Sequence, residues 1–134
     1  MKHLLFAPLA LAFGIVAAET PPQILDGYSA EAARQQPGFE PRAARGGALY
    51  TQRFQVSEKM PACTACHMER PAGGGRHAVT GKDIKPLAPA ANTERLTDRA
   101  RVEKWFRRNC TEVVGRECSA AEKADFLAFL LEAR

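Results

Sequence analysis

The feature that most constrains this chain is the pentapeptide "CTACH" at residues 63–67. Cys63 and Cys66 stand three positions apart, and His67 directly follows the second thiol. One turn of helix with this C-x-x-C-H spacing presents both thiols to one edge of a porphyrin and sets the imidazole beneath the iron. The pattern predicts covalent attachment of one haem c per chain through Cys63 and Cys66, with His67 as an axial ligand of the iron.

Three other uses of a C-x-x-C pair compete with haem attachment. A zinc site needs a second ligand pair, and Cys110 with Cys118 is a poor one because no histidine adjoins it. A thioredoxin-like redox pair follows a strand in a βαβ pattern, which the sequence lacks. A plain disulfide leaves His67 and the long irregular segment after it unexplained. The sequence therefore favours haem.

The first eighteen residues have the pattern of a cleaved signal peptide. Lys2 and His3 precede an apolar, uncharged run from Leu4 to Ala17, and small residues precede Glu19. The alternative is a membrane anchor, but the run is shorter than the roughly 20 residues of a spanning helix. We expect residues 1–18 to be removed on export, which leaves one domain over residues 19–134 and no stable membrane span.

The charge of that domain gives no indication of a nucleic-acid partner. Loss of Lys2 with the leader lowers the formal net charge from +4 to +3, and the propionates of a haem would lower it further. The basic residues are interspersed with acids, as in "TERLTDRARVEKWFRR", which is typical of a solvated face. We therefore expect no nucleic acid among the partners.

Helical patterns without a convincing strand make this an all-α chain. The segment 20–35 reads as a helix capped by Thr20, with two prolines in its first turn. A second helix is expected over about 42–54, where Gly46 and Gly47 are poor helix formers and therefore indicate a close helix crossing. A third is expected to begin at a Thr97 cap. A fourth begins at Ser119, which forms an S-x-x-E capping box.

Each helix has one apolar side. The residues expected to face inward are Ile24, Leu25 and Tyr28, then Ala48, Leu49 and Phe54, then Val102, Trp105 and Phe106, and finally Phe126, Leu127, Leu130 and Leu131. Between the haem motif and the third helix, residues 69–92 show no clear periodicity. A loop of that length in a small domain usually has a function or encloses a bound group, and a planar cofactor would explain its length.

Cys110 and Cys118 are left to pair with each other. They flank the turn "TEVVGRE" between the last two helices, with Gly115 as its expected bend. Closing so short a loop stabilises the fold by about 2–3 kcal/mol in the chain-entropy model. The disulfide would also fix the end of the third helix. Free thiols are the alternative, but disulfides are the rule for cysteines of an exported chain.

The second axial ligand of the iron is not a methionine. Met1 leaves with the leader, Met68 follows His67 on the wrong side, and Met60 is little better placed. No methionine occurs after residue 68. The ligand set of an ordinary small electron-carrying cytochrome is therefore effectively excluded.

His77 is the next candidate for that position. Ten residues of chain can extend about 33–36 Å, so reach does not forbid it. Its setting, "GGGRHAVTG", reads as a surface loop. Lys82 and Lys85 are weaker candidates and are expected in solvent. The residues alone leave a vacant or weakly ligated iron.

From about Gln23 to its end the chain resembles the SHP family of small high-spin class I c-type cytochromes. The segments that carry the resemblance are "CTACH", "TGKDIKPLAP", "LTDRARVEKWFRRNC" and "VGRECSAAEKADFLAFL". The resemblance implies a small class I cytochrome c-like domain of four to five helices around one covalent haem, exported to the periplasm. It also implies that the sixth ligand of the oxidised iron is an asparagine side chain just before the first cysteine of a disulfide. The matching residue is Asn109, followed by Cys110.

The resemblance implies a function as well. A neutral amide oxygen is a hard, weak ligand that suits ferric better than ferrous iron, so reduction should release Asn109 and open the site. The family accepts electrons from a dihaem c-type cytochrome and binds the diatomic ligands O2, NO and CO. Trp105, one turn before Asn109, is a candidate both for haem contact and for core packing. A simple electron carrier and an oxygen-, peroxide- or NO-reacting haem enzyme stay open as alternatives.

Overall fold

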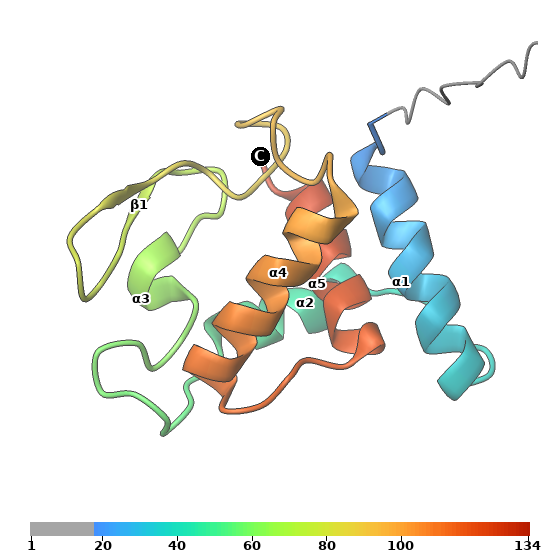
Figure 1. Cartoon of the computed structure of the whole chain (residues 1–134), viewed down its shortest axis with the longest axis horizontal. Coiled ribbons are helices and arrows are strands. Elements are labelled where there is room, and N and C mark those ends of the chain that lie inside the picture. Colours follow the sequence, from blue (N-terminus) through green and yellow to red (C-terminus); the bar gives the residue numbers. More distant parts are fainter. Residues whose placement is uncertain (1–17) are drawn as a thin grey trace, which may run out of the picture.

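The computed structural model describes residues 18–134, which form helices joined by one long irregular segment (Figure 1). The expected signal peptide lies outside the described residues except for Ala18. In the described part no helix is both long and apolar enough to cross a membrane. The elements are α1 (Pro21–Gln35), α2 (Ala43–Thr51), α3 (Thr64–His67), β1 (Gly75–Arg76), β2 (Asp83–Ile84), α4 (Arg99–Asn109), the π-helix η1 (Cys110–Val114) and α5 (Ala120–Glu132).

The predicted all-α class is confirmed, with one small exception. Two strands of two residues each pair antiparallel, with Gly75 opposite Ile84 and Arg76 opposite Asp83. They form a hairpin inside the segment 69–92, which the sequence predicts as irregular. Strands this short carry no periodicity that a sequence pattern could reveal.

Side-chain caps fix where three of the helices begin. The predicted cap of α1 at Thr20 and the predicted capping box of Ser119 with Glu122 at α5 are both present. The cap of α4 is Asp98, whose carboxylate accepts the Arg101 backbone N–H at 3.0 Å, so the predicted Thr97 cap is wrong by one residue. The Thr97 hydroxyl instead donates to the Glu94 carbonyl at 3.1 Å.

Helix α2 crosses α5 at close range, as its glycines predict. A Cβ on Gly46 would lie 2.0 Å from the backbone oxygen of Asp125. Helix α2 ends at Thr51 and is therefore shorter than predicted. Its buried residues are Gly46 and Tyr50, four positions apart on one face. The expected inward position of Ala48 is wrong, because residue 48 lies on the other side of this helix and is exposed.

Helix α5 is the centre of the buried core and packs against both α1 and α2. A cluster of buried side chains joins α1, α4 and α5, and each large apolar member contributes about 1.5–3 kcal/mol by leaving water. Phe106 of α4 packs edge-on against Tyr28 and Phe126, with ring centroids 5.8 Å apart in both pairs. The members of the cluster are Ile24, Tyr28, Val102, Ala124 and Leu127.

Two parts of the chain lie outside this core. Trp105 is 43% exposed, so its predicted inward position is wrong and it makes no core contact of the kind that Phe106 makes. Helix α3 and the hairpin lie on the side of α4 away from α1 (Figure 1). The haem motif is therefore carried beside the helical core and not within it.

Candidate haem site

The motif forms one helical turn. The backbone N–H groups of Cys66 and His67 donate to the Cys63 carbonyl at 3.2 and 3.0 Å. Residues three apart lie on the same side of such a turn, so the two thiols face one direction and the imidazole follows beside them. Met68 ends the turn with a φ of 61°. The structure therefore brings together Cys63, Cys66 and His67, the three residues that the sequence assigns to haem attachment.

Contacts from two other elements, α2 and β1, hold this turn in place. The Tyr50 hydroxyl shares its proton between the His67 carbonyl at 3.0 Å and the Met68 carbonyl at 2.6 Å. The backbone of Gly75 in β1 packs directly on α3, since a Cβ there would lie 2.1 Å from the Cys66 carbonyl oxygen. The motif is thus fixed to α2 on one side and to the hairpin on the other.

The protonation of the motif suits haem better than a thiolate metal site. Burial, together with the positive charge of Arg95 and the nearby His77, lowers the pKa of His67 to about 4, so the imidazole is neutral at pH 7. A neutral imidazole is the form that ligates iron. Burial raises the pKa of Cys63 to about 11, which keeps that side chain a thiol, whereas zinc sites use thiolates.

The structure also disfavours the three alternative uses of the cysteine pair. Among residues 18–134 no group of three His, Cys, Asp or Glu side chains is arranged to hold a metal ion. Cys63 and Cys66 are free thiols and are not bonded to each other. Both strands follow the motif in the chain, so no strand leads into it as in a thioredoxin-like site.

His77 lies in the hairpin turn, next to a residue that contacts the motif. Its Nδ1 accepts the backbone N–H groups of Val79 and Thr80, both at 3.2 Å, inside the hairpin turn. The next residue along, Ala78, donates its N–H to the Cys66 sulfur at 3.2 Å. The hairpin therefore packs against the turn that carries the proximal ligand, which does not favour His77 as a ligand on the opposite face. Lys85, a weaker candidate, is 75% exposed and pairs with Glu94 at 3.3 Å.

Asn109 is the last residue of α4 and is exposed. Within residues 18–134 its side chain makes no hydrogen bond to another residue, and none joins it to the motif. The chain winds into η1 immediately after it, and such π-turns are frequent at functional sites. Sequence reasoning missed this change of helix type.

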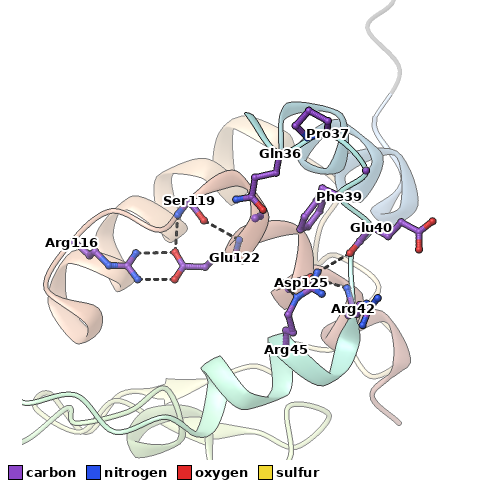
Figure 2. A pocket seen from close by; sticks show the side chains of 12 residues that line it. Gln36, Pro37, Phe39, Glu40, Arg42, Arg45, Arg116, Ser119, Glu122 and Asp125 are labelled. Atoms are coloured by element: carbon purple, nitrogen blue, oxygen red, sulfur yellow. Dashed lines mark hydrogen bonds and ion pairs between the residues drawn. The ribbon is translucent and has the colours of Figure 1, made fainter. Parts of the chain in front are cut away.

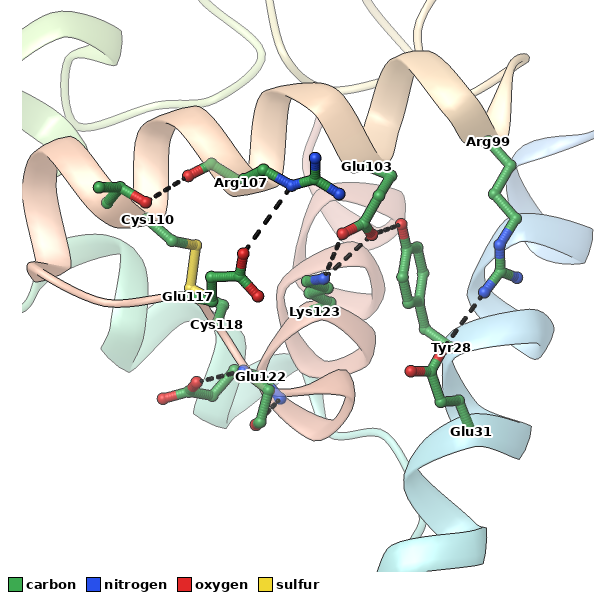
Figure 3. A network of polar contacts seen from close by, with 12 residues as sticks. Tyr28, Glu31, Arg99, Glu103, Arg107, Cys110, Glu117, Cys118, Glu122 and Lys123 are labelled. Carbon is green, nitrogen blue, oxygen red and sulfur yellow. Dashed lines mark hydrogen bonds and ion pairs between the residues drawn. A yellow bond between two sulfur atoms is a disulfide. The ribbon is translucent and has the colours of Figure 1, made fainter.

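A disulfide closes the segment that begins at Asn109. The sulfurs of Cys110 and Cys118 are 2.01 Å apart, with their Cα atoms at 5.7 Å (Figure 3). The expected bend at Gly115 is present and has a φ of 82°. A Cβ on Gly115 would lie 2.8 Å from a methyl group of Val56, so this segment touches the loop that leads into the motif.

One surface depression lies away from the motif. It has a volume of about 740 Å³ and is lined by the α1–α2 connection and the start of α5. Two ion pairs lie in its wall, Arg45 with Asp125 and Arg116 with Glu122 (Figure 2). A smaller depression of about 490 Å³ lies beside the motif, lined by Thr64, Met68, Glu69, Arg70 and Gly73. The chemistry of the motif, and not the size of a hollow, therefore locates the site.

Two residues near the motif escaped the sequence analysis. Tyr50 and Arg95 both contact backbone carbonyls of segments distant in sequence. The one available signal for Tyr50 was its spacing of four residues from Gly46, which puts it on the face that crosses α5.

Comparisons with known proteins give close relatives. Residues 36–130 match the family described as a domain of unknown function, DUF1924. The chain is 44% identical over 133 residues to the cytochrome c-type protein SHP of Cereibacter sphaeroides, a match that covers 97% of this chain and 98% of that protein. It is 42% identical over 106 residues to cytochrome c'' of Methylophilus methylotrophus, covering 78% of this chain and 74% of the relative.

Solved structures agree with these matches. Oxidised SHP, described as an oxygen-binding cytochrome c, superposes with a TM-score of 0.76 at 44% identity, over 84% of this chain and 96% of that one. The crystal structure of oxidised cytochrome c'' gives a TM-score of 0.78 at 37% identity, over 85% and 94%. A solution structure of the same cytochrome c'', which addresses its haem-ligand detachment, gives 0.74 at 38% identity, over 84% and 92%.

Proposed function

Since this chain belongs to the family of c-type cytochromes that contains SHP and cytochrome c'', we propose that it is a periplasmic monohaem cytochrome that binds diatomic ligands when reduced. Cys63 and Cys66 hold one haem c through thioether bonds, and His67 is the proximal ligand. Bound there, the haem iron supplies one-electron redox chemistry and an axial position for O2, NO or CO. The observation that carries the proposal is the single turn that sets two thiols beside a half-buried, neutral imidazole.

Asn109 is the displaceable sixth ligand in this proposal. Its amide is exposed and has no protein hydrogen bond to lose when it moves. It also stands where the α-helical winding of α4 changes, so its position need not follow the rigid helix. An amide oxygen is a hard ligand that binds ferric iron weakly and ferrous iron more weakly still. The haem-ligand detachment studied in cytochrome c'' supports a ligand that leaves the iron in this family.

Electron delivery and location are parts of the same proposal. The leader pattern of residues 1–18 supports export to the periplasm. We propose a dihaem c-type cytochrome as the electron donor, which stopped-flow reduction by such a protein would test. Catalytic turnover is not proposed, because the acid nearest to Asn109 in sequence, Glu112, is paired with Arg108 at 3.0 Å and is poorly suited to donate a proton.

The test compares Asn109→Ala with His77→Ala in the haem-loaded protein. We expect Asn109→Ala to leave the covalent haem in place, to convert the oxidised iron from six-coordinate to five-coordinate, and to speed ligand binding to the oxidised form. An acceleration on the order of tenfold corresponds to about 1.4 kcal/mol for the displaced amide. Binding of O2 or NO to the reduced form should change little, because the amide has already left.

Optical and electron paramagnetic resonance spectra, with mass spectrometry under denaturing conditions, provide the readouts. His77→Ala serves as the control and should leave the oxidised spectrum unchanged. A changed spectrum in His77→Ala with an unchanged one in Asn109→Ala would make the protein a bis-histidine electron carrier. A six-coordinate spectrum in both redox states would also favour a simple carrier, and a mass without a haem adduct would refute the whole proposal.

A further inference from the structure

Arg95, in the segment between the hairpin and α4, is a partly buried cation without a counter-charge. Its Nε donates to the Pro86 carbonyl at 2.9 Å, and a terminal nitrogen donates to the Lys85 carbonyl at 3.0 Å. Both acceptors are neutral. A guanidinium carries five N–H donors in a planar fork, so these two bonds leave part of the fork free. Removing such a charge from water is costly unless an anion compensates it.

The other arginines of the described chain do not share this situation. Only Arg95 and Arg99 are not exposed, and Arg99 pairs with the Glu31 carboxylate at 3.4 Å. Within residues 18–134 Arg95 has no carboxylate partner. The contrast indicates an anion that is not part of the polypeptide.

A chain of contacts places Arg95 beside the haem motif. The backbone of Gly75 packs on Cys66 and His67, and the N–H groups of residues 87 and 88 donate to the Pro71 carbonyl at 2.9 and 3.0 Å. Arg95 is bonded to the two residues just before these, so it belongs to the same folded segment. This segment, through Gly75, packs on the turn that carries His67.

We propose that Arg95 is the residue that binds a propionate of the haem. The inference rests on the proposed function, because a haem held by Cys63, Cys66 and His67 would bring two carboxylates to this region. The free part of the guanidinium fork matches a carboxylate in shape and charge, and such pairs form charge-assisted hydrogen bonds. A fixed positive charge near the iron also favours the reduced state, which carries one positive charge less.

The alternative is that Arg95 only stabilises the loop, through its hydrogen bonds to the carbonyls of Lys85 and Pro86. The experiment separates the two roles with Arg95→Gln, which removes the charge, and Arg95→Lys, which keeps the charge but loses the fork. Arg34→Gln is the matched control, since it removes the same charge from an exposed position in the last turn of α1. All three variants are studied with haem attached.

Resonance Raman spectroscopy of the propionate bending mode is the deciding readout, because its frequency follows hydrogen bonding to the propionate and not loop stability. We expect this band to shift in Arg95→Gln and partly in Arg95→Lys, and the midpoint potential to fall in Arg95→Gln while Arg34→Gln resembles the wild type. A lower melting temperature of Arg95→Gln, with the propionate bending band at the wild-type frequency, would overturn the inference. Arg95 would then only stabilise the loop. Absence of attached haem in the wild type would instead refute the proposed function.

Discussion

At the scale of single residues, Tyr50 connects the helical core to the haem motif. Its ring is fully buried and packs against Phe129 and Phe126, with centroids 5.3 and 6.1 Å away. Its hydroxyl ends on the carbonyls of His67 and Met68. Burial raises the pKa of Tyr50, so the hydroxyl keeps the proton that these bonds need. The Tyr50 side chain thus fixes the backbone at His67, the expected proximal ligand.

Replacing Tyr50 with Phe should make the backbone of His67 and Met68 less rigid without removing the haem. We expect a loss of about 1–3 kcal/mol in the free energy of unfolding, since two partly buried hydrogen bonds lose their donor. We also expect a change in the axial-ligand spectrum. Tyr28→Phe is the control, because Tyr28 is equally buried and its hydroxyl donates to Glu103 at 2.7 Å, away from the motif. Identical spectra in the two variants would reduce Tyr50 to a packing residue.

The sequence was informative about individual residues where their chemistry is local. Cys63, Cys66 and His67 are adjacent, so their joint use could be predicted and the structure places them on one turn. Asn109 could be proposed only through the family resemblance, because an asparagine at a helix end is ordinary. Tyr50 and Arg95 could not be predicted, because every residue offers a carbonyl and no sequence pattern says which carbonyl will be reached.

At the scale of elements, the junction of α4 and η1 is the unusual feature. The helix changes winding at Cys110, and the disulfide to Cys118 ties this point to the start of α5. Helix starts with a side-chain cap were predictable to within a residue, and the error at α4 arose because Thr97 and Asp98 are both good caps. The π-turn was not predictable, since no local residue preference distinguishes it from a continued α-helix.

Removing the disulfide should affect both stability and the iron. We expect a Cys110→Ser, Cys118→Ser variant to lose about 2–3 kcal/mol, because the closed loop is short. Haem should stay attached, since the thioether bonds are independent of this pair. The segment carrying Asn109 should loosen, and the oxidised spectrum should shift toward that of a five-coordinate iron. An unchanged spectrum together with unchanged ligand affinity would limit the disulfide to a structural role; reduction of the wild type serves as the comparison.

At the scale of the whole molecule, a polar network joins three helices across the core (Figure 3). Glu103 of α4 accepts the Tyr28 hydroxyl of α1 at 2.7 Å and pairs with Lys123 of α5 at 2.8 Å. Burial raises the pKa of Glu103, but the hydrogen bonds from Lys123 and Tyr28 outweigh it and hold the pKa below the ordinary value. The all-α architecture was predictable from helix periodicity, whereas this network depends on how the helices meet.

The network predicts a specific dependence of stability on pH. Because the pKa of Glu103 is lower in the folded protein, its stabilising effect is complete above the ordinary value of 4.5 and is lost as the pH falls through the folded value. Glu103→Gln should therefore be less stable than the wild type at pH 7, with a difference that shrinks below pH 4.5. Denaturant titrations across pH measure this. Glu94→Gln is the control, since its pair with Lys85 is 75% exposed on both sides and should contribute little.

The position of α3 beside the core has a consequence for the maturation of this cytochrome. None of residues 63–67 is among the buried side chains, whereas Ile24, Tyr28 and Leu127 are enclosed by α1, α4 and α5 alone. The motif therefore lies on a partly exposed turn outside the buried cluster. If haem attaches at that turn, thioether formation needs access only to residues 63–67 and not to the apolar cluster.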